Sequence, residues 1–239
     1  MSETKLDSVY DPPVDEPAHM ARIKSLRPRD ASTLIIVRRD AAMPRVLMGR
    51  RNAGHSFMPD KWVFPGGRID RSDFRAPHAT ELRPRVAARL ETAASPARAR
   101  ALALCAVRET FEETGLLLAR PAPALPFAGP WRTFLAHGAL ADLAALEVIA
   151  RAITPTRRTR RFDARFFMAD AERLISLERL PDCGELDEIA WVDLDEAAGL
   201  DLPNITRFIL QELALRLEDP DRPAPFVRTL NGVQKLAHF

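Results

Sequence analysis

Short runs of apolar and β-branched residues, broken by proline, glycine and charged residues, recur along the chain. Runs of this length and composition are typical of strands. They predict strands over residues 32–38, 45–50, 61–64, 161–168 and 188–192, with a final edge strand over 225–233. The first two flank a short turn that contains Pro44, so we expect them to form a hairpin.

Longer segments rich in alanine, leucine and charged residues predict helices over residues 84–93, 98–114, 139–153 and 205–217. Gly115 and Asn204 stand where a C-terminal and an N-terminal helix cap are expected. Strands and helices do not alternate regularly. This order favours an α/β (α+β) fold, a mixed central sheet with helices on its faces, over a doubly wound nucleotide fold.

The chain has 239 residues, of which 46% are hydrophobic, enough for one enlarged domain or two small ones. Proline and charged residues dominate residues 1–30, which we expect to form a mobile or surface-draped tail. We expect residues 31–239 to form a single domain with an insertion at about 74–99. That insertion is open to two roles, a cover over the active site or a homodimer interface.

No apolar run approaches the ~20 residues that span a bilayer, and residues 1–10 lack the apolar core of a signal peptide. Cys105 and Cys183 lie far apart and support neither a disulfide framework nor a zinc site. We therefore expect a cytoplasmic protein with no membrane partner. The net charge of +2 does not indicate a nucleic-acid partner. Arginine supplies 31 of the 35 basic residues, which fits either a GC-rich genome or bidentate phosphate contacts.

Three carboxylates, Glu109, Glu112 and Glu113, fall on one stripe of the helix predicted over 98–114, because positions i, i+3 and i+4 are surface neighbours. The opposite, apolar stripe carries Leu104, Val107 and Phe111. One interpretation of the acidic stripe is a solvated surface. However, its like charges repel one another at the negative end of the helix dipole. A bound Mg²⁺ or Mn²⁺ would remove both penalties, and carboxylate oxygens suit these ions.

The same helix carries a motif that is continued upstream. Gly67 is followed after five residues by Asp73, and residues 108–116 read Arg-Glu-Thr-Phe-Glu-Glu-Thr-Gly-Leu. This pattern resembles the Nudix box of Nudix hydrolases. Thr110 stands where the family has an aliphatic residue, and Asp73, or alternatively Asp70, stands for the first glutamate of the box. Between Asp73 and Arg108 lie 34 residues instead of seven, so the box is split by an insertion.

A split box resembles the branch that includes peroxisomal coenzyme A diphosphatases. Further stretches similar to that branch are Phe57-Met-Pro59, Trp62-Val-Phe-Pro-Gly-Gly67, Ile153-Thr-Pro155 and residues 161–167. Glu185-Leu-Asp-Glu188, before Trp191-Val192, resembles a late segment of many Nudix folds. The coenzyme A signature has glycine four residues before the Phe of the Phe-Pro-Gly-Gly sequence, where this chain has Asp60. The resemblance implies a Nudix-type α/β/α sandwich.

The resemblance also implies roles for the box residues. Glu109, Glu112 and Glu113 would hold Mg²⁺ or Mn²⁺ against the oxygens of a diphosphate. The catalytic base would be a box glutamate, Glu109 or Glu113, or a late carboxylate, Glu185 or Glu188. A simple surface charge is the competing interpretation of the last two. Arg108 would brace the loop by pairing with Asp73 or a glutamate, and Gly66 and Gly67 would shape that loop.

The implied activity is hydrolysis of the diphosphate bond of a small nucleoside diphosphate derivative, with coenzyme A or acyl-coenzyme A as the leading substrate. ADP-ribose, NADH and dinucleoside polyphosphates remain alternatives, as does a Nudix fold that binds a ligand without turnover. Arginines are the expected substrate contacts: Arg50 and Arg51 for the diphosphate, and Arg157, Arg158, Arg160 and Arg161 for a further phosphate. A solvated basic loop is the competing interpretation of the second group.

Overall fold

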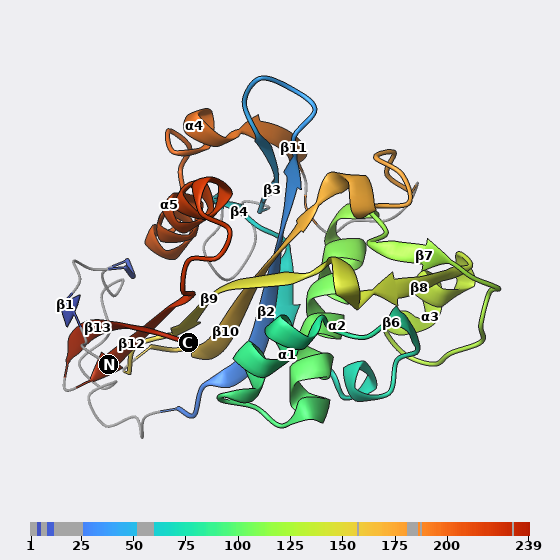
Figure 1. Ribbon diagram of the computed structural model, residues 1–239, viewed down its shortest axis with the longest axis horizontal. Coiled ribbons are helices and arrows are strands. Elements are labelled where there is room, and N and C mark those ends of the chain that lie inside the picture. The colour runs from blue at the N-terminus through green and yellow to red at the C-terminus, as the bar shows by residue number, and fades with distance from the viewer. Residues whose placement is uncertain are drawn as a thin grey trace.

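The computed structural model describes residues 4–5, 9–11, 26–51, 60–156, 158–180, 186, 188–230 and 232–239. In this part of the chain, ten strands form one mixed sheet (Figure 1). Eight of them follow the order β1-β13-β12-β9-β10-β2-β3-β11, while β4 pairs with β3 and β5 with β2. Their bounds are β1 Thr4–Lys5, β2 Arg29–Arg38, β3 Arg45–Arg50, β4 Trp62–Val63, β5 Gly66–Arg68, β9 Glu147–Ile153, β10 Phe162–Asp170, β11 Glu188–Asp193, β12 Pro225–Leu230 and β13 Val233–His238. Strand β10 is parallel to β2, and β12 to β9; the other pairs are antiparallel.

Helices cover both faces of this sheet, which explains the unbroken apolar run in β2. Leu34 and Ile36 pack into one core with α1 (Pro84–Glu91) and α2 (Pro96–Thr114). Ile35 and Val37 face the other way and pack into a second core with α5 (Asn204–Glu218). Figure 1 shows α5 on one side of the central strands and α1 with α2 on the other. The predicted mixed α/β sandwich is therefore confirmed.

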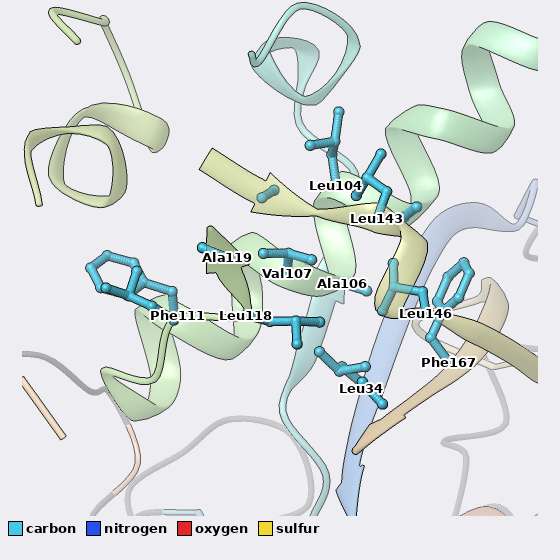
Figure 2. Close-up of a cluster of buried hydrophobic side chains, with 14 of the residues drawn as sticks. Leu34, Leu104, Ala106, Val107, Phe111, Leu118, Ala119, Leu143, Leu146 and Phe167 are labelled. Carbon is cyan, nitrogen blue, oxygen red and sulfur yellow. The ribbon is translucent and has the colours of Figure 1, made fainter. Parts of the chain in front are cut away.

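Helix α2 begins and ends at residues whose chemistry suits those positions. The Ser95 side chain accepts a hydrogen bond from the Arg98 N–H, and Pro96 occupies the first turn. Gly115 ends the helix with φ 74°, and its N–H donates to the Phe111 carbonyl, as the sequence predicts. The apolar stripe is buried: Leu104, Val107 and Phe111 pack with β2, β10 and the strand β7 (Figure 2). The acidic stripe is thereby turned away from this core.

The hairpin of β2 and β3 is paired only at its turn end, through Val37 with Val46 and Arg38 with Arg45. Beyond this point the two strands separate, and each gains a new neighbour. Strand β4 pairs with the end of β3, and β5 pairs with the start of β2. The Pro65-Gly66 turn that joins β4 to β5 is thereby held between them, and the Pro65 carbonyl accepts a hydrogen bond from the Leu34 N–H at 3.0 Å.

The segment at 74–99, expected to be an insertion outside the core, contributes to the core. Ala76, Val86, Leu90 and Ala99 are buried there. Strand β6 (His78–Thr80) also belongs to a second sheet of order β6-β8-β7, formed with β8 (Ala139–Asp142) and β7 (Ala119–Pro121). The remaining short helices are α3 (Trp131–Ala136) and α4 (Leu194–Ala197).

The helix predicted over 139–153 is wrong. This segment forms β8, one 3-10 turn and β9. Alanine and leucine favour helix locally, but β9 lies between β10 and β12, with Val148 in one core and Ile149 in the other. Burial on both faces of a sheet outweighs a propensity difference of about 0.7 kcal/mol per residue or less.

The C-terminal and N-terminal segments differ from expectation in three respects. The predicted edge strand over 225–233 is two strands, with β12 inside the sheet and β13 next to it. Asn204 does not cap α5: it is the first helical residue, and its N–H faces the Asp11 carboxylate, at 3.2 Å from Oδ2. Within the expected tail, Val9 is only 5% exposed and packs into the second core. Across the described ranges, no helix has the length and apolar character required to cross a membrane.

Candidate active site

A cavity of about 840 Å³ opens where α2, the Pro65-Gly66 turn and the start of β2 meet. Glu109 and Glu113 of α2 line one part of it. Aromatic and aliphatic side chains line another, including Phe64, Phe162, Phe166 and Ile205. Arginines from four segments complete the lining: Arg29, Arg51, Arg68 and Arg160, together with Arg108. The cavity lining thus combines acidic, basic and apolar side chains.

The glycine pair allows the acidic side chains to lie against the backbone of the turn. A Cβ atom on Gly67 would lie 2.3 Å from Glu109 Oε2, so any larger residue here would require this carboxylate to move. A Cβ atom on Gly66 would lie 2.6 Å from the Ser32 carbonyl oxygen. The Gly66 N–H donates a hydrogen bond of 3.0 Å to Glu113 Oε2. The turn therefore limits the position of the Glu109 carboxylate by close contact and that of the Glu113 carboxylate by a hydrogen bond.

Arg108 connects the helix carboxylates to the loop. Its buried guanidinium donates to Glu109 Oε1 at 2.8 Å and to Glu112 Oε2 at 2.7 Å. It also donates to the Arg68 carbonyl at 3.0 Å. Two further bonds, of 2.9 and 3.0 Å, go to the two carboxylate oxygens of Asp73. All five guanidinium protons thus have an oxygen partner, and the pairing with Asp73 expected from the sequence is present.

Of the two aspartates considered for the first box position, Asp73 accepts hydrogen bonds from Arg108. Asp73 is 0% exposed, and each of its oxygens accepts two hydrogen bonds. Besides Arg108, the donors are the Trp131 Nε1–H at 2.8 Å and the Asp70 N–H at 2.7 Å. Asp70 itself caps the short helix at Arg71–Phe74 by accepting from Ser72 N–H.

Burial and neighbouring charges perturb the ionisation of this site. Burial raises the pKa of Glu109, Arg108 lowers it, and the charges of Glu112 and Asp73 raise it again, with a net increase. Burial also lowers the pKa of Arg51, against the opposing effect of Glu113, and Arg160 lowers it further. Each ionised group therefore benefits from a ligand of opposite charge: a cation beside Glu109 and an anion beside Arg51.

The carboxylates suit a hard divalent cation, although they do not form a complete metal centre in this conformation. Within the described ranges, no group of three or more His, Cys, Asp or Glu side chains is placed to hold a metal ion. Glu109 and Glu113 line the cavity, whereas Glu112 does not, although Glu112 and Glu109 are both ion-paired with Arg108. The oxygen donors and the raised pKa of Glu109 fit Mg²⁺ or Mn²⁺.

Several sequence-predicted residues lie away from the cavity lining. Arg50 lies on β3 and pairs with Asp60 at 3.5 Å and with Glu188 at 3.8 Å. Glu188 is 54% exposed. Adjacent strand positions point to opposite sides, so Arg51 reaches the cavity while Arg50 does not. Asp60, at the position where the signature has glycine, has φ 59°, a left-handed conformation that is uncommon for residues other than glycine.

The arginines at positions 158, 160 and 161 differ in their surroundings: two donate hydrogen bonds to backbone carbonyls, and one lines the cavity. The Arg158 guanidinium donates to the Asp11 carbonyl, and that of Arg161 donates to the Thr154 carbonyl at 3.1 Å. Arg160 lines the cavity. Arg157 and Glu185, both predicted site residues, lie outside the described residues.

Sequence reasoning missed Arg29, Arg68 and Trp131. Arg29 and Arg68 come from segments far from the basic run, and only the strand pairing brings them to it. Phe162 pairs with Arg29, and Arg68 with Ala31. A prediction of the parallel pairing between β2 and β10 would have found Arg29, and Arg68 requires the antiparallel pairing of β5 with β2 as well. The sequence around Trp131 carries no signal for its bond to Asp73.

Comparisons with known proteins agree with this geometry. No family model matches the chain. The chain is 28% identical over 230 residues to the acyl-coenzyme A diphosphatase NUDT19 of Gallus gallus, covering 71% of this chain and 57% of that protein. It is also 28% identical over 183 residues to the putative nudix hydrolase 7 of Caenorhabditis elegans, covering 70% and 52%. The chain therefore spans little more than half the length of these curated relatives.

The crystal structure of a NUDIX hydrolase from Alicyclobacillus acidocaldarius matches with a TM-score of 0.56 and 29% sequence identity, covering 77% of this chain and 90% of that chain. The present chain is a mixed-sheet sandwich, and its helix α2 presents carboxylates to a cavity beside a glycine turn. The chain is thus similar in sequence and in fold to Nudix hydrolases, and one of its curated relatives is named an acyl-coenzyme A diphosphatase.

Proposed function

We propose that this protein is a Mg²⁺-dependent hydrolase of the diphosphate bond in coenzyme A or acyl-coenzyme A. The observation that carries the proposal is the placement of Glu109 and Glu113 on a cavity whose other lining includes several arginines. Carboxylates suit a divalent cation, and guanidinium groups suit phosphate oxygens. A diphosphate with its metal ion needs both kinds of group in one cavity.

Glu109 and Glu113 would hold the metal ion from the cavity wall, with Glu112 next to them on the same stripe of α2. When bound, the cation neutralises diphosphate charge and stabilises the charge that develops as water attacks phosphorus. Arg108 fixes the orientation of Glu109 and Glu112 through its bonds of 2.8 and 2.7 Å. Gly66 fixes Glu113. Preorganised carboxylates cost little reorganisation during the reaction.

The remaining steps belong to protein side chains. Arg51 binds diphosphate oxygens, because it lines the cavity and lies close enough to Glu113 for the charge of that carboxylate to raise its pKa. A carboxylate that accepts the proton of the attacking water must lie within hydrogen-bond reach of that water. Glu109 and Glu113 line the cavity and are in place for this role, whereas Glu188 does not line it.

Two observations support coenzyme A derivatives as the substrate. One curated relative is named an acyl-coenzyme A diphosphatase. The cavity lining also includes the apolar side chains of Phe64, Phe162 and Phe166, which can cover the nucleoside or the pantetheine chain while the diphosphate lies at the carboxylates.

The test is product formation by the purified protein from coenzyme A, acetyl-coenzyme A, NADH, ADP-ribose and diadenosine polyphosphates, each with Mg²⁺ and with chelator. The proposal predicts that Mg²⁺-dependent cleavage of coenzyme A gives adenosine 3′,5′-bisphosphate and phosphopantetheine. Cleavage of another compound alone would replace the substrate and keep the chemistry. No cleavage of any compound would contradict the enzyme assignment and favour a ligand-binding module.

A further inference from the structure

A second cavity, of about 650 Å³, lies beside the first. The two share Arg29, Arg68 and Arg160 as lining residues, so they are neighbours with a common wall. Arg27 and Arg161 also line the second cavity, and its lining includes no aspartate or glutamate. We refer to this space, defined by Arg27, Arg29, Arg68, Arg160 and Arg161, as the arginine cavity.

The fold brings these arginines together at one end of the sheet. Arg29 begins β2 and pairs with Phe162, the first residue of β10, so Arg160 and Arg161 lie directly before the paired strand. The Arg29 N–H donates to the Arg161 carbonyl at 3.0 Å. Arg68 ends β5, which pairs with the start of β2. The Arg161 side chain donates to the Leu26 carbonyl and so holds the segment that carries Arg27.

Several arginines of the arginine cavity differ from arginines elsewhere in the chain in their lack of ion pairs with described carboxylates. Glu147, for example, is ion-paired with three arginines, Arg83, Arg85 and Arg89. By contrast, no ion pair within the described residues joins a carboxylate to Arg27, Arg29 or Arg68. The nearby Asp30 is already paired with Arg98 at 2.6 Å and with Arg165 at 3.3 Å.

Gathering Arg27, Arg29 and Arg68, which form no ion pair with a described carboxylate, raises the free energy of the protein through repulsion. A phosphate monoester carries up to two negative charges and accepts bidentate hydrogen bonds from guanidinium groups, so it offsets this repulsion. An anion of this chemistry fits the arginine cavity better than an apolar or cationic group.

We propose that the arginine cavity binds a second phosphate of the substrate, a monoester separate from the diphosphate that is cleaved. The inference rests on the proposed function, because the common wall allows one ligand to place its diphosphate at Glu109 and Glu113 and its monoester among the arginines. It makes the enzyme selective for nucleoside diphosphate derivatives that carry an additional phosphate, such as the 3′-phosphate of coenzyme A.

The kinetic test compares coenzyme A with dephospho-coenzyme A, which lacks only the 3′-phosphate. The variant is Arg27→Gln with Arg68→Gln. Its control, Arg71→Gln with Arg75→Gln, removes the same charge from nearby exposed residues that line neither cavity. Hydrogen bonds between charged groups are stronger than those between neutral groups, so we expect the ratio of kcat/KM for coenzyme A to that for dephospho-coenzyme A to fall about 10-fold or more. The control should keep the wild-type ratio.

An equal loss of activity toward both substrates, or no loss, would overturn the proposed subsite. A binding measurement separates this outcome from a failure of the proposed function. Calorimetry on the wild-type protein with adenosine 3′,5′-bisphosphate and with adenosine 5′-monophosphate requires no turnover. Tighter binding of the bisphosphate, lost in the Arg27→Gln, Arg68→Gln variant, supports the arginine cavity even if coenzyme A is not cleaved. Equal binding of both nucleotides contradicts it even if coenzyme A is cleaved.

Discussion

Replacing Asp73 by asparagine tests the network that holds the helix carboxylates in place. Each Asp73 oxygen accepts two hydrogen bonds, one of them from Arg108. In Asp73→Asn, one oxygen becomes an NH₂ group. Whichever way the amide is turned, this group faces two donors, and the Arg108 guanidinium loses one of its three carboxylate partners, the fully buried one. The substitution keeps the shape of the side chain, so its effect reports on charge and hydrogen bonding.

The magnitude follows from the number of bonds that are lost. Two hydrogen bonds to a buried carboxylate, at about 1.5–3 kcal/mol each, agree with the about 3–5 kcal/mol lost when one partner of a buried ion pair is removed. For a chain of this size, each kcal/mol lowers Tm by about 2–4 °C, so we expect a decrease of roughly 6–20 °C. Trp131→Phe removes one of the four hydrogen bonds and keeps an aromatic ring, so it should cost about 1–2 kcal/mol.

Urea unfolding, followed by both fluorescence and circular dichroism, measures these free energies. Asp195→Asn is the matched control, because Asp195 is exposed and forms no ion pair with a described residue; it should change stability by no more than about 0.5 kcal/mol. A loss below about 1 kcal/mol in Asp73→Asn would refute the role of Asp73 as the buried anchor of Arg108.

Three further predictions concern α2 and the turn beside it. Gly67→Ala places a Cβ atom 2.3 Å from Glu109 Oε2, so we expect kcat to fall about 10-fold or more while unfolding shows a loss of about 1–3 kcal/mol; normal kcat would contradict the close packing. Thr110→Val should change the free energy of unfolding by less than about 1.5 kcal/mol, because the buried Thr110 hydroxyl bonds only to the Ala106 carbonyl of its own helix, and a larger loss would show a role that this bond does not explain. Burial, followed by the charge of Asp73, raises the pKa of the Cys105 thiol, so iodoacetamide at neutral pH should modify Cys105 after unfolding but not in the native protein, as peptide mapping can determine.

The parts of the fold that could be predicted are those in which local pattern and tertiary environment agree. Strand β2 is apolar at successive positions because both faces are buried, and α2 has a cap, an apolar stripe and a terminal glycine in one continuous segment. The segment 139–153 is different. Its alanines and leucines favour a helix, and only its position between β10 and β12 makes residues 147–153 a strand.

The candidate site likewise contains residues whose proximity could be predicted from the sequence and residues whose proximity could not. Glu109, Glu112 and Glu113 lie on one helix, so helical periodicity alone places them together. Arg108 and Asp73 could be paired because opposite charges flanked the interruption of the box. Arg29, Arg68 and Arg160 meet only through pairing between strands distant in sequence, which no local pattern encodes.

The most direct test of the proposed active site is the turnover number of Glu113→Gln toward coenzyme A at saturating Mg²⁺, compared with that of Glu188→Gln. Both substitutions remove one carboxylate charge, but only Glu113 lines the cavity. We predict that kcat falls by about 100-fold or more in Glu113→Gln, with the fold intact, and stays within about twofold of wild type in Glu188→Gln. Near-normal turnover in Glu113→Gln would contradict the assignment of this cavity as the catalytic site.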